Sequence, residues 1–207
     1  MHGLHYRDGV EPLFDVEHES PLPPDFRHHR HWLPADAADR YLAVLTSELA
    51  WAQRPLVIGG RRVMTPRLTY WVGPEPFRYS GGVEPVHAWT AELNEIRAQA
   101  NSAAGVEFNS VLANLYRDGN DSMGAHRDDE PEFGARPVIA SVNLGATRDF
   151  AIKHDVTGER HVIALGHGDV LVMSGRSQLD WSHSVPKRAR VTQPRINLTF
   201  RQWKSGN

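Results

Sequence analysis

The sequence predicts an α+β domain that is mostly β: a double-stranded β-helix (jelly-roll) core with N-terminal helices packed on one side. The chain has 207 residues, a length typical of one domain. Two stretches of the first half repeat apolar residues at helical spacing. From residue 108 onward, short apolar segments alternate with turn residues, which is typical of sandwiches and barrels.

Three regions follow one another within this single domain. Residues 1–33 are rich in Pro, acidic residues and His, and we expect an irregular arm with at most one short strand. Residues 34–105 hold the helices, and residues 106–207 hold the β core. The run His28, His29, His31 has no acidic neighbour, so a solvated basic stretch is favoured over a metal site.

Two helices are predicted, and their apolar faces are expected to pack against the core. The first spans Pro34 to Trp51, with Asp36 as a candidate N-cap. The second spans Val86 to Ala103, and Gly105 is its expected stop. The later strands are expected at residues 108–116, 137–144, 148–153, 160–165, 169–174, 181–184 and 195–203.

Composition excludes several classes of protein. The chain has no cysteine, which rules out disulfides, thiolate zinc sites, iron–sulfur clusters and a Cys nucleophile. No apolar run is long enough to span a bilayer, and the first residues show no signal-peptide pattern, so a cytoplasmic protein without a membrane partner is expected. We also expect a monomer. Twelve histidines are many for this length, and His is the commonest metal ligand.

A His-x-Asp pair, His126 and Asp128, is the sharpest candidate for metal chemistry. Side chains alternate along an extended segment, so both residues project to one side. A second histidine would complete a 2-His-1-carboxylate triad of the kind that binds Fe(II). The candidate is His183, because it lies 57 residues after His126, which leaves room for four short strands. A second His-x-Asp pair, His167 and Asp169, lies only 16 residues before His183, which leaves room for about two strands. Its glycines are typical of a tight turn.

The last predicted strand alternates strictly between polar and apolar residues. Ile196, Leu198 and Phe200 form one face. Arginines inside a barrel need anionic partners, and a bound dicarboxylate would supply them. The alternative is an edge strand whose arginines face water, which is less favoured so close to a candidate iron ligand. The polar face is Arg195, Asn197, Thr199 and Arg201.

Basic and aromatic residues are interleaved between the two predicted helices, as in nucleic-acid grooves. A twisted hairpin with ordinary surface arginines would give the same pattern. The residues concerned are Arg61, Arg62, Arg67, Tyr70, Trp71, Phe77 and Tyr79.

Several motifs in order resemble the AlkB family of Fe(II)- and 2-oxoglutarate-dependent dioxygenases, most of all its branch that repairs duplex DNA. They span residues 55–203 and read Asn114-Leu115-Tyr116-Arg117-Asp118-Gly119, His126-Arg127-Asp128-Asp129-Glu130, Ile139-Ala140-Ser141, Arg148-Asp149-Phe150, His183-Ser184-Val185-Pro186 and Arg195 through Arg201.

The resemblance implies Fe(II), 2-oxoglutarate and O2 as cofactor and cosubstrates. His126, Asp128 and His183 would bind the iron. Arg195 would pair with the distal carboxylate of 2-oxoglutarate, and Arg201 would contact its other end or brace Asp128. The remaining residues implied to contact the cosubstrate are Asn114, Tyr116 and Asn197.

The resemblance also implies alkylated DNA, or RNA, as partner, with residues 34–105 including a nucleotide-recognition lid. Asp129 would accept from the exocyclic amino group of the base, and Tyr79 would stack on the base. Arg61 and Arg62 would contact phosphates, as would the basic loop Pro186–Arg190. The segment Val57-Ile58-Gly59 resembles the apolar finger that fills the gap in a duplex.

The implied activity is oxidative demethylation of N1-methyladenine and N3-methylcytosine in DNA, with release of formaldehyde. Three alternatives stay open. The same chemistry could act on RNA, a protein or a small molecule. The chain could also be a non-catalytic module that holds a metal, or an adaptor that binds nucleic acid through its arginines.

Overall fold

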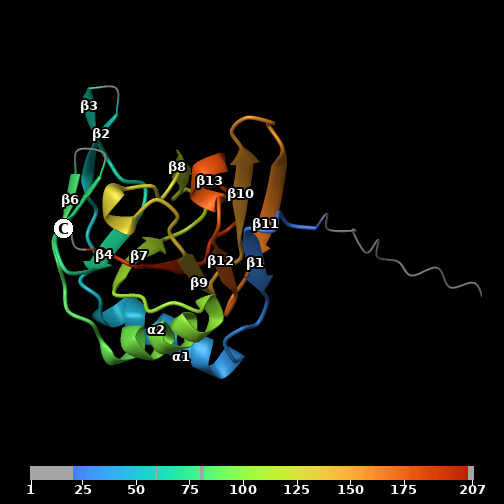
Figure 1. Ribbon diagram of the computed structural model, residues 1–207. Coiled ribbons are helices and arrows are strands. Elements are labelled where there is room, and N and C mark those ends of the chain that lie inside the picture. The colour runs from blue at the N-terminus through green and yellow to red at the C-terminus, as the bar shows by residue number, and fades with distance from the viewer. Residues whose placement is uncertain (1–20, 59, 80–81, 205–207) are drawn as a thin grey trace, which may run out of the picture.

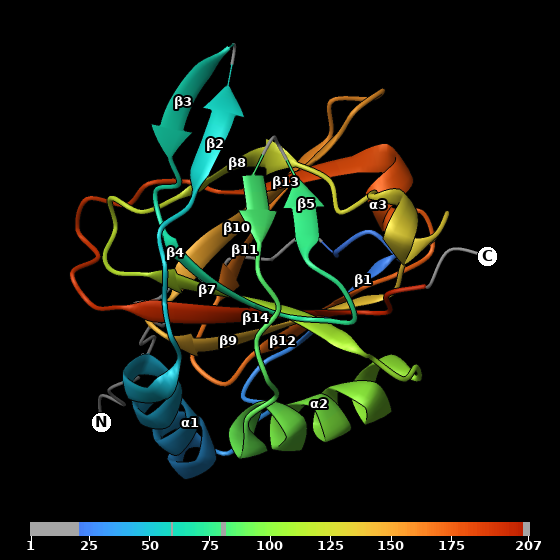
Figure 2. The same cartoon turned by 90° about the vertical axis from the view of Figure 1, so that its left-hand side faces the viewer.

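The computed structural model describes residues 21–204 except residues 59, 80 and 81, and it leaves out the side chains of residues 56, 58 and 79. Two antiparallel sheets face each other, and two helices cover the outer side of the larger sheet (Figures 1 and 2). This is the expected double-stranded β-helix with helices on one side. None of the helices within the described residues is both long and apolar enough to cross a membrane.

The larger sheet has six strands in the order β1-β12-β9-β14-β7-β4. Its strands come from the arm, from the region between the helices and from the second half of the chain. Their bounds are β1 Phe26–His29, β4 Leu68–Val72, β7 Ser110–Tyr116, β9 Ile139–Gly145, β12 Val170–Met173 and β14 Arg195–Arg201.

The smaller sheet has four strands in the order β11-β10-β13-β8. Strand β8 is Met123–His126, β10 is Arg148–His154, β11 is Arg160–Leu165 and β13 is Trp181–Val185. A short helix, α3 (Ser177–Asp180), leads directly into β13, and a 3-10 turn, η1 (Pro131–Phe133), follows β8.

The first helix, α1 (Ala35–Glu48), is shorter than predicted, and its cap differs. Pro34 occupies the N-cap position without a side-chain bond, and Asp36 lies inside the first turn. The prediction of Asp36 as N-cap was therefore wrong. The chain leaves the helix before Trp51, whose indole Nε1 donates back to the Leu45 carbonyl at 3.1 Å.

The second helix, α2 (Ala91–Ala104), starts five positions later than the predicted Val86. Val86 instead forms a parallel bridge with Trp71, which keeps this stretch extended. The Thr90 hydroxyl then caps the helix by accepting from the Leu93 N–H at 3.2 Å, a contact typically worth about 1 kcal/mol. Gly105 ends the helix in the left-handed region (φ 72°), as predicted.

Alternation along β14 separates two layers of packing. Ile196, Leu198 and Phe200 lie in the apolar core between the larger sheet and the helices. The alternate residues Arg195, Asn197, Thr199 and Arg201 are also buried, but they face the smaller sheet. The space between the sheets is therefore polar at its centre, although apolar side chains such as Phe150 and Ile152 fill one part of it.

The arm joins the barrel through β1, which pairs with β12. His28 is not solvated as predicted, because its Nε2 lies 2.9 Å from Asp169 Oδ2. The His31 N–H donates to the other oxygen of Asp169 at 2.9 Å. An acidic partner far along the chain thus ties this histidine stretch to the β12 end of the barrel.

Two hairpins stand over one end of the sheets, on the side away from α1 (Figure 2). One consists of β2 (Pro55–Ile58) and β3 (Arg61–Met64), and the other of β5 (Phe77–Tyr79) and β6 (Gly82–Glu84). All four side chains of β3 are exposed, although two of them, Val63 and Met64, are apolar.

Candidate active site

A cavity between the two sheets brings the candidate residues together. It holds about 380 Å³ of empty space and opens to solvent. Strands β7 and β14 line one side and strands β8, β10 and β13 line the other. The lining residues are Leu112, Asn114, Tyr116, Met123, His126, Asp128, Ser141, Phe150, Met173, His183, Val185, Asn197, Thr199 and Arg201.

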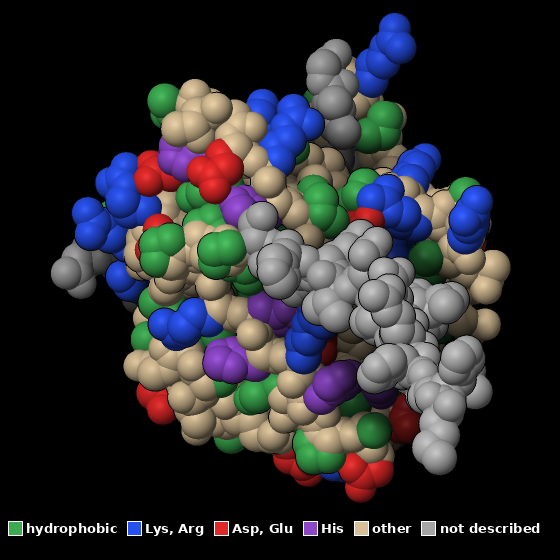
Figure 3. All heavy atoms as spheres, turned by 90° about the vertical axis from the view of Figure 1, so that its right-hand side faces the viewer, with side chains coloured by type: hydrophobic (Ala, Val, Ile, Leu, Met, Phe, Trp, Pro, Cys, Tyr) green, Lys and Arg blue, Asp and Glu red, His purple; other side chains and the backbone are tan. Residues whose placement is uncertain are grey.

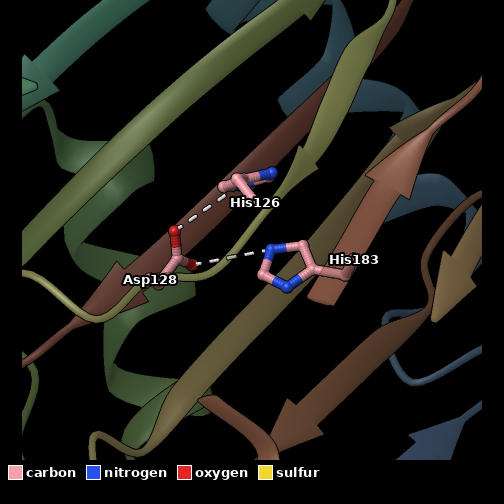
Figure 4. Close-up of side chains that lie close together, drawn as sticks. All are labelled: His126, Asp128 and His183. Carbon is pink, nitrogen blue, oxygen red and sulfur yellow. Dashed lines mark ion pairs between the residues drawn. The ribbon is translucent and has the colours of Figure 1, made fainter. Parts of the chain in front are cut away.

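His126, Asp128 and His183 converge in this cavity (Figure 4). One nitrogen or oxygen atom from each residue lies within 4.8 Å of the others. The Nε2 of His126 is 3.7 Å from Asp128 Oδ1, and the Nε2 of His183 is 4.0 Å from Asp128 Oδ2. Two imidazoles and a carboxylate at this separation can bind a divalent metal ion with positions left open.

The sheet pairing explains why residues so distant in sequence meet. In the smaller sheet, His183 of β13 lies directly opposite His126 of β8, and their ring centroids are 4.2 Å apart. The chain between them forms strands β9 to β12, the four strands for which the sequence leaves room. His167 lies elsewhere, with Nδ1 accepting from the Gly145 N–H and Nε2 3.3 Å from Asp39.

Both imidazoles are held in forms that can bind a metal. A carbonyl only accepts, so the 2.9 Å contact to Gly124 O places a proton on His126 Nδ1 and leaves the Nε2 lone pair free. Burial, together with the nearby His126, lowers the pKa of His183 to about 3, so this ring is neutral at physiological pH. Phe150 stacks on the His183 ring with centroids 5.1 Å apart, which fixes its plane.

Asp128 is buried and stays ionised. Burial alone would raise the pKa of Asp128, but the Arg201 guanidinium, with smaller contributions from His183 and His126, holds it well below its usual value. Arg201 Nη2 lies 2.7 Å from Asp128 Oδ1. Of the two roles implied for Arg201, the contact seen here is the one that braces Asp128.

Arg195 is buried and is not among the residues that line the cavity. Its Nη2 donates to Asn143 Oδ1, and its guanidinium carbon is 5.1 Å from the centroid of the Tyr116 ring. Burial lowers the pKa of Arg195 to about 10, because little compensates its charge. Among the described residues, the Nε and Nη1 atoms of both Arg195 and Arg201 are buried without a hydrogen-bond partner. These unsatisfied donors fit an anionic ligand with carboxylate groups.

Three further predicted residues lie on the cavity wall: Asn114, Tyr116 and Asn197. Asn197 Nδ2 donates to Ser141 Oγ at 2.7 Å, and its Oδ1 accepts from the Thr199 hydroxyl at 3.0 Å. Asn114 Oδ1 accepts from Arg67 Nε at 2.7 Å. Arg67, one of the basic residues interleaved with aromatics in the sequence, is therefore buried beside the cavity and does not lie on the surface.

Three of the residues predicted to contact a nucleic acid are exposed in the structure. Asp129 is exposed and follows Asp128 directly, while Arg61 and Arg62 are exposed on the β2–β3 hairpin. Val57 is 51% exposed on the same hairpin. The Tyr79 and Ile58 side chains and the whole of Gly59 lie outside the described residues. The stacking role of Tyr79 and the role of the finger therefore stay predictions.

The sequence motifs gave no role to Arg148, although its side chain joins two loops. This buried side chain donates to the carbonyls of Asp118, Asp121 and Pro186 at 2.7–3.1 Å. It thereby fastens the loop after β7 to the basic loop before β14. Arg148 alternates with the buried residues Phe150 and Ile152 along β10, and this alternation was the only local signal that its side chain points inward.

Comparison with known proteins assigns the family. The pattern of the 2OG-Fe(II) oxygenase superfamily matches residues 25–201. The human "Alpha-ketoglutarate-dependent dioxygenase alkB homolog 3" is 41% identical over 174 residues, covering 79% of this chain and 61% of the human protein. The chain thus spans about three-fifths of the length of that relative.

Two further comparisons agree with this assignment. The mouse "DNA oxidative demethylase ALKBH2" is 35% identical over 201 residues, which cover 86% of this chain and 84% of the mouse protein. The solved structure of OsALKBH1 shares the fold with a TM-score of 0.60 at 18% identity, over 88% of this chain and all of that one. The superfamily pattern covers most of the chain and the relatives carry AlkB names, so this chain belongs to the AlkB family of Fe(II)- and 2-oxoglutarate-dependent oxygenases.

Proposed function

We propose that this protein removes alkyl groups oxidatively from base nitrogens in DNA, using Fe(II), 2-oxoglutarate and O2. The observation that carries the proposal is a cavity that holds a two-histidine, one-carboxylate cluster and the Arg201 side chain, with Arg195 buried on the same strand. Both arginines have buried guanidinium nitrogens without a partner among the described residues. The cluster fits a divalent metal, and the guanidinium groups fit a small dicarboxylate.

Each of the candidate site residues has a part in this scheme. His126, Asp128 and His183 would hold the iron. Arg195 would pair with the distal carboxylate of 2-oxoglutarate, and Arg201 would keep Asp128 ionised and in place. When bound, iron and 2-oxoglutarate together activate O2 for the oxidation of an unreactive C–H bond. Asn114, Tyr116 and Asn197 would orient the cosubstrate by hydrogen bonds.

The proposed substrate follows from the oxidation chemistry and from the need of the base to enter the cavity. Hydroxylation of an N-methyl group yields an unstable hemiaminal, which loses formaldehyde and restores the base. A base within a duplex must flip out to enter such a cavity, at a cost of a few kcal/mol. Lesions that already block pairing lower that cost, which favours N1-methyladenine and N3-methylcytosine.

Charge favours the same lesions and a nucleic-acid partner. Both methylated bases are cationic, and the exposed Asp129 carboxylate beside the cluster would attract them. Arg61 and Arg62 on the hairpin, and Lys187 and Arg190 on the basic loop, are exposed and suited to phosphates. Tyr79 would stack on the flipped base. The names of the related proteins, one of them a DNA demethylase, support DNA as the substrate.

The test is reconstitution of the metal-free protein with Fe(II) and 2-oxoglutarate under anaerobic conditions. Oxygen is then admitted with oligonucleotides carrying N1-methyladenine or N3-methylcytosine, as single-stranded DNA, duplex DNA and RNA. Formaldehyde, succinate and the repaired base are measured. We expect formaldehyde and restored bases from at least one DNA form. Succinate without repair of any DNA would contradict the proposal, and repair of RNA alone would move the substrate to RNA.

A further inference from the structure

The backbone of Asp128 is held by a side chain to which neither the motifs nor the family comparison assigns a role. Strand β8 ends at His126, so Asp128 lies outside the β ladder. Its N–H donates to the side-chain oxygen Oε1 of Gln178 at 2.9 Å. Asp128 is 4% exposed and Gln178 is 2% exposed, so water does not replace this bond at either end.

Gln178 is placed where it joins the two chain segments of the metal cluster. It lies in α3, and the next element, β13, begins at Trp181 and carries His183. The Gln178 amide nitrogen donates to a weak acceptor, Met173 Sδ at 3.6 Å, and to Ser177 Oγ at a long 3.4 Å. The hydrogen bond from the Asp128 N–H is therefore the shortest of the polar contacts described for the Gln178 side chain.

Other contacts fix the carboxylate but leave the backbone to Gln178. Arg201 holds Asp128 Oδ1 from β14. The pairing of β8 with β13 is regular at His126 and His183 but shifts in register between His183 and Val185. Without Gln178, the Asp128 N–H would be a buried donor without a partner, and the segment would have to move to satisfy it.

We propose that Gln178 is a positioning residue that sets the distance of the Asp128 carboxylate from the two imidazoles and thereby sets metal affinity. The inference rests on the proposed function, because it takes the cluster to be a metal site. Residues that orient metal ligands typically change metal affinity by about 10–100-fold when they are replaced. Gln178 does not line the cavity, so cosubstrate contacts are not expected to change.

The test is titration of metal-free protein with Mn²⁺ alone, following free Mn²⁺ by electron paramagnetic resonance. The variant Gln178→Leu keeps the size of the side chain and removes the acceptor. The milder variant Gln178→Asn keeps an amide but shortens its reach, and it serves if the leucine variant fails to fold. We expect both to bind Mn²⁺ about 10–100-fold more weakly. At saturating Fe(II), the KM for 2-oxoglutarate should stay unchanged.

Ser177→Ala is the matched control, because Ser177 is equally buried in the same helix and is only 3.4 Å from the amide nitrogen. Its Mn²⁺ affinity should equal that of the unaltered protein. The inference is overturned by a loss of threefold or less in the Gln178 variants, or by an equal loss in the control. It is also overturned if metal-free Gln178 variants melt at lower temperature but bind Mn²⁺ normally once folded.

The variant His126→Ala separates this inference from the proposed function. If the unaltered protein binds Mn²⁺ no more tightly than His126→Ala does, the cluster is not a metal site, and the proposed function fails first. If His126→Ala loses binding while Gln178→Leu retains it, only the role of Gln178 is refuted.

Discussion

Arg195 illustrates how a single buried charge narrows the choice of ligand. Its guanidinium is buried with two nitrogens unsatisfied, and its pKa is lowered to about 10. An uncompensated charge of this kind is costly, so a folded protein keeps one where an anion compensates it. The distal carboxylate of 2-oxoglutarate is the anion that the proposed function supplies.

Replacing Arg195 should therefore weaken cosubstrate binding more than turnover. Arg195→Lys keeps a positive charge but loses the two parallel N–H donors. We expect the KM for 2-oxoglutarate to rise about 10–100-fold. A rise of this size corresponds to the loss of one charge-assisted hydrogen bond, which is worth about 1.5–3 kcal/mol. The turnover number at saturation should change little. Steady-state succinate formation measures both quantities, and an unchanged KM would place the cosubstrate carboxylate elsewhere.

Local sequence patterns identify only some of the residues that form the site. His126 and Asp128 stand out as a pair, and strand alternation marks Arg195 and Arg201. Gln178 and Arg67 carry no such pattern. Each acts on a residue about fifty positions away, and such a contact depends on which strands meet in space.

Among the elements, β1 pairs with β12, and one carboxylate adds a second attachment at the end of this pair. Asp169 accepts from the N–H groups of Gly166 and His31 and from His28, at 2.8–2.9 Å. Burial alone would raise the pKa of Asp169, but these hydrogen bonds hold it below its usual value. Its contribution to stability is present above the unfolded pKa of about 3.9 and is lost as pH falls through the lower folded pKa.

Asp169→Asn should lower the free energy of unfolding at neutral pH by about 1–3 kcal/mol, because buried donors lose their acceptor. Urea denaturation at pH 7 measures the loss. The difference from the unaltered protein should shrink as pH falls below about 3.9, where the carboxyl of the unfolded chain becomes protonated, and should be lost below the lower pKa of the folded state. Asp36→Asn, at an exposed position in the first turn of α1, is the control and should change stability far less. Equal losses in the two variants would contradict the assignment.

The basic loop before β14 is docked on the loop after β7 through a glycine. A Cβ on Gly119 would lie 1.7 Å from the Arg188 carbonyl oxygen, and the Gly119 N–H donates to Val191 O at 2.7 Å. No side chain other than hydrogen fits there unless the loop moves. The loop is thus presented as a preformed surface rather than a free coil.

Gly119→Ala should displace this loop and weaken DNA binding by about tenfold, the loss of one charge-assisted contact. Fluorescence anisotropy with a methylated oligonucleotide measures the affinity. Metal affinity should be unchanged, because the displaced loop does not include the cluster. Unaltered DNA affinity would show that residues 186–191 do not face the nucleic acid.

The boundaries of the elements were less predictable than their existence. Apolar spacing identified both helices and most strands of the core. It could not reveal that Val86 pairs with Trp71 and delays α2, or that Pro34 caps α1 in place of Asp36. These outcomes are decided by contacts with distant strands and by backbone geometry at single positions, which periodicity does not encode.

At the scale of the whole molecule, a net charge of −2 conceals an uneven distribution. On the face that carries β10 and β11, Figure 3 shows scattered Lys, Arg and His side chains with Asp and Glu side chains among them. Arg61 and Arg62 add exposed positive charge on the hairpin at the mouth. Such a distribution lets an acidic protein attract phosphates locally.

DNA binding should accordingly weaken with salt, and single hairpin arginines should contribute to the slope. Arg61→Ala or Arg62→Ala should each reduce the slope of log affinity against log salt by about 0.9, the value for one phosphate contact. Arg40→Ala is the matched control, since Arg40 lies on α1, at the far end of the molecule from this hairpin (Figure 2). A slope that falls equally in the control would assign binding to general charge rather than to the hairpin.

The proposed function requires that His126, Asp128 and His183 together hold one ferrous ion. Anaerobic titration of the metal-free protein with Fe(II) in the presence of 2-oxoglutarate tests it most directly. We expect one Fe(II) per chain in the unaltered protein, and a loss of tight binding in His126→Ala, Asp128→Ala and His183→Ala alike. Tight binding of Fe(II) that survives any one of these substitutions would contradict the claim.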